Sequence, residues 1–112
     1  MVEKVLLDYL TENLEVPVYM EKPAEHGKTY VLIEKTGSTT MNKIYSPVVA
    51  VQSYAPTLYE AAALNEEVKE AVFSSVSLDS ISAVRLNSDY NFTDTSTKEY
   101  RYQSVFVITY LE

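Results

Sequence analysis

Few residues in this chain could carry out chemistry. There is one histidine, His26, and there are no cysteines. A catalytic or metal-binding histidine needs a partner side chain within reach, and His26 has only Glu25 beside it, in a segment with the composition of an exposed loop. We therefore interpret His26 as a solvated loop residue, and we expect no zinc site, because zinc in proteins is held mainly by Cys and His.

Carboxylates gather around the last third of the chain, at Asp79, Asp89, Asp94 and Glu99. Such a group could hold Ca²⁺ or Mg²⁺, but these residues lack the spacing of a calcium-binding loop. We expect Asp89 and Asp94 to accept hydrogen bonds from the backbone in turns instead. Only two glycines are present, and they stand apart, so no phosphate-binding loop is expected. The sequence predicts a protein without enzymatic activity, metal or cofactor.

Length and composition predict one domain, residues 1–112. No basic segment precedes an apolar run, and no apolar run approaches the ~20 residues of a membrane helix, so we expect synthesis in the cytoplasm and no membrane contact. The formal net charge is −7, and the nine basic residues are spread along the sequence. Binding to nucleic acid normally needs a basic face, so no specific nucleic-acid binding is expected.

Hydrophobic periodicity predicts the elements that would position any site. Apolar residues recur every three or four positions over residues 2–15, which predicts a helix. Strands are predicted at 18–21, 29–35 and 48–54. A loop is predicted at 22–28, and the polar segment 36–43 is either a wide hairpin tip or a flexible arm.

A second helix should begin at Thr57, which forms a capping box with Glu60. Residues 81–92 and 99–111 predict a final hairpin, because the second of these runs alternates strictly between two faces. The predicted order is α-β-β-β-α-β-β. This order favours an α+β fold in which an antiparallel β-sheet carries two helices packed on one face.

Two blocks of the sequence carry a resemblance to a known family. The first is VQSYAPTLYEAAALNEEVKEAV and the second is SDYNFTDTSTKEYRYQSVFVITYL. Together with the N-terminal amphipathic helix that leads into VPVYMEKP, and with TYVLIEKTG, these blocks resemble the tail terminator (tail-completion, minor capsid) proteins of long-tailed phages that infect Gram-positive bacteria.

The resemblance implies a structural virion protein at the head–tail junction, assembled in the host cytoplasm. Proteins of this kind form a hexameric ring that caps the tail tube, stops its polymerisation and docks to the head connector. The expected partners are therefore further copies of the chain, the tail tube protein and a head-completion or connector protein. Two alternatives remain open: another neck protein, such as a head-closure or stopper component, and a stand-alone α+β binding module that inhibits a host factor.

The segment around 36–45 is the predicted assembly contact. It is polar and bears a glycine, so it could become ordered on binding, and it carries Met41, an adaptable apolar side chain suited to interfaces. The candidate contact residues are Thr36, Gly37, Thr39, Met41, Asn42, Lys43, Ile44 and Tyr45.

Overall fold

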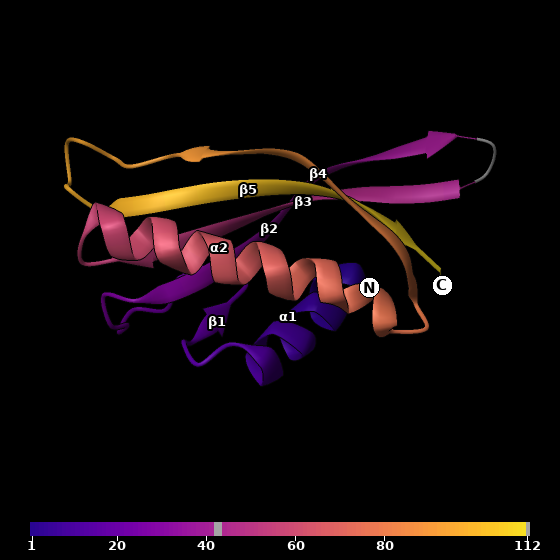
Figure 1. Ribbon diagram of the computed structural model, residues 1–112, viewed down its shortest axis with the longest axis horizontal. Helices are drawn as coiled ribbons and strands as arrows, with labels where there is room; N and C mark the ends of the chain where they lie inside the picture. Colours follow the sequence, from indigo (N-terminus) through magenta and orange to yellow (C-terminus); the bar gives the residue numbers. More distant parts are fainter. Residues whose placement is uncertain (42–43, 112) are drawn as a thin grey trace.

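The computed structural model describes residues 1–41 and 44–111. Two helices pack on a five-stranded sheet, so the predicted α+β class and the predicted element order are confirmed (Figure 1). The helices are α1 (Val2–Asn13) and α2 (Leu58–Ser74), and α2 runs into a short 3-10 helix, η1 (Ser75–Ser77). The strands are β1 (Val18–Tyr19), β2 (Tyr30–Met41), β3 (Ile44–Ala55), β4 (Ile81–Asn91) and β5 (Tyr100–Tyr110).

The strands lie in the order β1-β2-β3-β5-β4. Three of the four strand pairs are antiparallel, as expected, but β1 pairs with β2 in parallel through Val18 and Val31. The sheet is therefore mixed. Parallel neighbours need a crossover connection, and residues 20–29 supply it between β1 and β2.

The first helix ends two residues earlier than the sequence predicts. Leu14 has extended backbone angles, and Pro17 shortly after it cannot continue a helix. The second helix begins where it is expected to begin, since the amide of Glu60 donates a hydrogen bond to Thr57 Oγ1 at 3.1 Å. That bond satisfies one of the free amides of the first turn.

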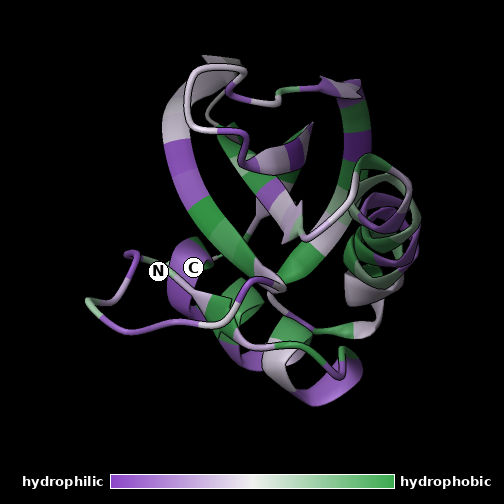
Figure 2. Ribbon diagram, turned by 90° about the vertical axis from the view of Figure 1, so that its left-hand side faces the viewer, coloured by the Kyte–Doolittle hydropathy of each residue, from purple (hydrophilic) through white to green (hydrophobic). Residues whose placement is uncertain are grey.

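The core lies between the helices and one face of the sheet. In Figure 2 the hydrophobic segments of the helices and strands face a common interior. The predicted stripe of α2 is buried in full, and it consists of Ala61, Leu64, Val68, Ala71 and Val72. The sheet meets it with Val49 and Val51 of β3 and with Phe106 and Ile108 of β5, all of them buried. The strict alternation of β5 therefore does place one set of side chains in the core.

The polar segment 36–43 is not a loop over its described part. Strand β2 continues to Met41, and β3 begins at Ile44, so the two strands are several residues longer than the sequence predicts. The prediction missed them because threonine-rich polar strands lack the hydrophobic alternation on which it relied, although threonine itself suits a strand. Together the two strands extend past the rest of the molecule at the right-hand side of Figure 1.

Candidate functional site

The predicted contact segment lies on a two-stranded extension of the sheet, which we call the hairpin arm (residues 37–41 and 44–47). Strand β3 pairs with β5 only from Val48 onward, and β2 pairs with β1 only at Val31 and Leu32. Within the described residues, the arm therefore has no third strand on either side. The residues of β2 on the arm whose burial is described are exposed, and so is Ile44, at 51%.

The structure brings most of the predicted contact residues together on this arm. Thr36 lies at a bulge, where the register shifts between Lys35 and Gly37. Thr39 pairs with Ser46, and Thr40 pairs with Tyr45. Met41 is the last residue of β2 and pairs with Ile44, but its side chain, like Asn42 and Lys43, lies outside the described residues.

Side-chain bonds across the two strands support the arm. Lys35 Nζ donates to Tyr45 Oη at 2.5 Å, and the same ammonium lies 5.2 Å from the centre of the Tyr45 ring. Thr39 Oγ1 donates to the carbonyl of Ser46 at 3.4 Å. These contacts are local and exposed to solvent. Tyr45 and Ser46 are half-buried and Pro47, at the base of the arm, is buried, whereas Ile44 and the β2 side of the arm leave exposed surface that is available to a neighbour.

Two strand edges of the sheet are also open. Strand β4 is the last strand on one side, and β2 beyond Leu32 has no partner on the other side within the described residues. An open edge presents unpaired amides and carbonyls, which are a template for pairing with another chain.

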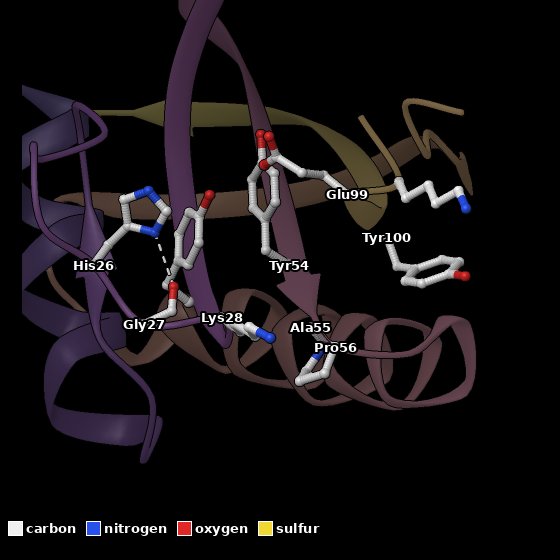
Figure 3. A pocket seen from close by; sticks show the side chains of 10 residues that line it. His26, Gly27, Lys28, Tyr54, Ala55, Pro56, Glu99 and Tyr100 are labelled. Carbon is white, nitrogen blue, oxygen red and sulfur yellow. Dashed lines mark hydrogen bonds between the residues drawn. The ribbon is translucent and has the colours of Figure 1, made fainter. Parts of the chain in front are cut away.

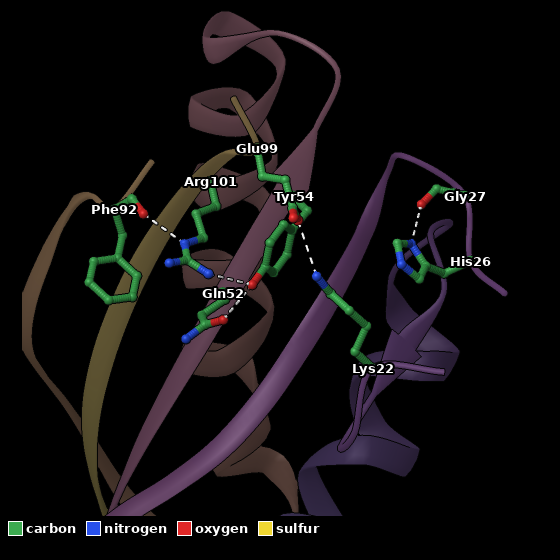
Figure 4. Close-up of polar contacts among 8 residues, drawn as sticks. All are labelled: Lys22, His26, Gly27, Gln52, Tyr54, Phe92, Glu99 and Arg101. Carbon is green, nitrogen blue, oxygen red and sulfur yellow. Dashed lines mark hydrogen bonds and ion pairs between the residues drawn. The ribbon is translucent and has the colours of Figure 1, made fainter. Parts of the chain in front are cut away.

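The opposite end of the sheet is closed by what we call the tyrosine clasp (Lys22, Tyr30, Tyr54, Glu99 and Arg101). Tyr30 and Tyr54 are paired across β2 and β3, and their rings are stacked with centroids 4.4 Å apart and planes 11° apart. Lys22 Nζ lies 5.2 Å from the centre of the Tyr54 ring and forms an ion pair of 3.1 Å with Glu99 Oε2. The ion pair joins the 22–28 loop to the 92–99 loop (Figure 4).

A chain of hydrogen bonds continues from the clasp along the sheet. Arg101 Nη1 donates to Tyr54 Oη at 2.8 Å, and Tyr54 Oη donates to Gln52 Oε1 at 2.9 Å. Gln52 Nε2 in turn donates to Gln103 Oε1 at 2.9 Å. Both glutamine side chains are buried, so these bonds supply the partners that buried amides need.

The environment of the clasp shifts two pKa values. The hydrogen bond to Glu99 raises the pKa of Lys22, with a further contribution from Tyr30, because both partners favour the charged ammonium. Burial raises the pKa of the Tyr30 hydroxyl, since a phenolate would lose its hydration there. Both groups therefore keep their ordinary neutral-pH forms, a cation and a neutral phenol, which is the state that the clasp requires.

A cavity of about 280 Å³ opens beside the clasp, and Figure 3 shows it. His26 and Lys28 lie on one side, Glu99 and Tyr100 on the other, and Ala55 and Pro56 lie between them. His26 is exposed, as predicted, but its ring packs against the ring of Tyr30, with the two centroids 4.8 Å apart. Its Nδ1 lies 2.8 Å from the carbonyl oxygen of Gly27. His26 is thus part of a cavity wall.

The acidic residues near the last hairpin have separate roles. Asp94 Oδ1 accepts hydrogen bonds from the amide and the hydroxyl of Ser96, as predicted for a turn residue, and these bonds lower its pKa. The prediction for Asp89 was wrong, since its carboxylate pairs with Lys69 of α2 at 3.1 Å. The sequence alone does not show that Asp89 of β4 lies next to Lys69 of α2.

No group of three or more His, Asp or Glu side chains in residues 1–41 and 44–111 is arranged to hold a metal ion. The helices in the same part of the chain are also too short or too polar to cross a membrane.

Sequence reasoning missed the clasp and its cavity. Lys22 and Glu99 lie far apart in the chain and meet only because β2, β3 and β5 are neighbours. The one usable signal was the abundance of tyrosine, with ten in the chain, but abundance does not say which rings pair.

No protein-family model matches this chain, and a search of curated proteins finds no matching sequence.

Proposed function

We propose that this chain is a structural virion protein, a tail terminator that forms a ring of six copies at the phage head–tail junction. In this role the ring caps the tail tube, stops its polymerisation and offers a docking surface to the head connector. The observation that carries the proposal is the hairpin arm, a mainly polar two-stranded extension of the sheet with no third strand beside it in the part of the chain that the structure describes. Such an extension is suited to contact with a neighbouring subunit.

The open edges support a ring. Strand β4 and the outer side of β2 lie on opposite sides of the sheet. If the β4 edge of one copy contacts the β2 edge of the next, the contact joins two different surfaces, and such a heterologous contact closes into a ring when the rotation allows it. The same contact would cover both edges, which reduces the hazard of uncontrolled aggregation.

The charge is compatible with a ring through which DNA passes. Each copy carries a formal charge of −7, so a ring of six copies would not attract the phosphate backbone strongly.

The test is to locate the protein on virions, tails and heads. An epitope tag is added at the C-terminus, and tagged particles are labelled with gold-conjugated antibody for electron microscopy. The proposal predicts label at the head-proximal end of isolated tails. Label on isolated heads but not on tails would favour a head-closure component, and unlabelled particles of every kind would favour a free binding module.

A further inference from the structure

The cavity beside the clasp combines an apolar floor with a cationic rim. Tyr54, Ala55, Pro56 and Tyr100 contribute apolar surface, whereas Lys28 and Lys98 bring ammonium groups from two different loops. Neither lysine forms an ion pair within residues 1–41 and 44–111.

The positive charge at this end is unusual for the molecule. The chain is acidic overall, yet four of its nine basic residues, Lys22, Lys28, Lys98 and Arg101, lie around the clasp and its cavity. The lining includes one carboxylate, Glu99, which is already paired with Lys22. Lys28 and Lys98 are therefore left with uncompensated charge beside an apolar surface.

The two loops that carry these lysines are held in place. The Lys22–Glu99 ion pair joins them, and Arg101 Nε donates to the carbonyl of Phe92 at 2.7 Å, which fixes the start of the 92–99 loop (Figure 4). Lys98 itself has a positive φ of 57°, and the adjacent turn is closed by the Asp94–Ser96 hydrogen bonds. A cavity held in this way loses little order when it is filled.

We propose that this cavity binds an acidic peptide segment of an assembly partner, with its carboxylates on Lys28 and Lys98 and an apolar side chain against Tyr54, Ala55 and Pro56. We favour a peptide over a phosphate ligand because the lining sets apolar surface from Tyr54, Ala55 and Pro56 beside its ammonium groups, and its single glycine, Gly27, cannot form a glycine-rich phosphate loop. The segments that line the cavity lie at the opposite end of β2 and β3 from the hairpin arm (Figure 1), so the two ends would serve different neighbours. The binding site stands on its own geometry, and only the identity of the partner rests on the proposed function.

The test is an NMR titration of the full chain with two capped tetrapeptides, Asp-Glu-Phe-Asp and its neutral analogue Asn-Gln-Phe-Asn. The acidic peptide should give saturable shifts at residues 26–28, 54–56 and 98–100, and the neutral peptide should give much weaker ones. The double variant Lys28→Gln, Lys98→Gln should weaken acidic-peptide binding about 2- to 30-fold, as expected for the loss of two exposed charge pairs. The matched control Lys4→Gln, Arg85→Gln removes two charges elsewhere and should leave binding unchanged.

Four results would overturn the inference. Equal binding of the neutral peptide would remove the role of the lysines, and equal loss in the control would reduce the effect to overall charge. Shifts at the cavity that depend on protein concentration without any peptide would make a second copy the occupant. Inorganic phosphate that reproduces the same shifts at the same concentration would show a site for small anions only. Because the titration uses the isolated chain, its failure would leave the proposed ring untouched.

Discussion

At the hairpin arm two strands project with no third strand beside them among the described residues, whereas at the tyrosine clasp two loops close over stacked rings. Both ends are built on the same two strands, β2 and β3, but the side chains that these strands carry differ between the two ends. On the arm, Thr39 and Ile44 are exposed, while at the other end Tyr30 and Tyr54 are at most 4% exposed. Burial and buried hydrogen bonds at the clasp favour folding, whereas the side-chain bonds of the arm are exposed to solvent and leave its surface for a neighbour.

The largest expected difference in stability is between a core variant and an arm variant. Leu64 of α2 is 5% exposed, and Leu64→Ala should lower the free energy of unfolding by about 2–5 kcal/mol, because the removed atoms leave a cavity. Ile44→Ala on the arm should change it by less than about 0.5 kcal/mol, as is usual for exposed positions. Urea denaturation of both variants measures the difference, and equal losses would show that the arm shares the core's stability.

A pair of tyrosine variants sharpens the contrast between the two ends. Tyr54→Phe removes a hydroxyl that accepts from Arg101 and donates to the buried Gln52, so it should cost about 1–2 kcal/mol. Tyr45→Phe removes a hydroxyl that meets Lys35 on the exposed arm and should cost less than about 0.5 kcal/mol. Thermal or urea unfolding of each variant tests this order, and a reversed order would contradict the assignment of stability to the clasp.

The smallest expected effect concerns the Lys22–Glu99 ion pair. Its side chains are 38% and 41% exposed, so Lys22→Gln should cost less than about 1 kcal/mol, and the cost should shrink in high salt. Because the folded state raises the pKa of Lys22, the contribution of the pair is complete at neutral pH and is lost as pH rises through that raised pKa. Unfolding measured at pH 7 and above pH 10.5 should show a larger loss in the native chain than in the variant, because Tyr30 and Lys69, whose pKa values are also raised, titrate in both. A loss of equal size in both would assign it to other groups.

The sequence alone predicts part of this fold. Apolar residues recur at helical spacing in α2, where Leu64 is one of them, and at every second position in β5, where Phe106 is one of them. These patterns predicted both elements and the side that each buries. The sequence did not predict the arm, because the arm forms only when β2 and β3 pair, and the hydrophobic pattern of either strand alone does not show that pairing. The sequence did not predict the clasp either, because Lys22 and Glu99 come together only when the strands are arranged in their observed order. Local signals predict elements, whereas contacts between distant segments need the fold.

The central claim is that the arm serves assembly and not folding. It is tested by a variant in which an Asn-Gly turn replaces residues 38–47 and joins Gly37 to Val48, which are register partners. A two-residue turn of this type suits an antiparallel hairpin. The control is Gly37→Ala, which keeps the arm, because an added Cβ there meets no atom within 4 Å.

Electron microscopy of lysates from phage that carry each change gives the most direct answer, with thermal unfolding of the purified chains as a check on folding. We predict that the turn variant unfolds like the native chain but leaves heads separate from tails, or yields tubes of abnormal length, while the control gives normal virions. Normal virions at normal titre from the turn variant would contradict the account and place the docking surface elsewhere on the molecule.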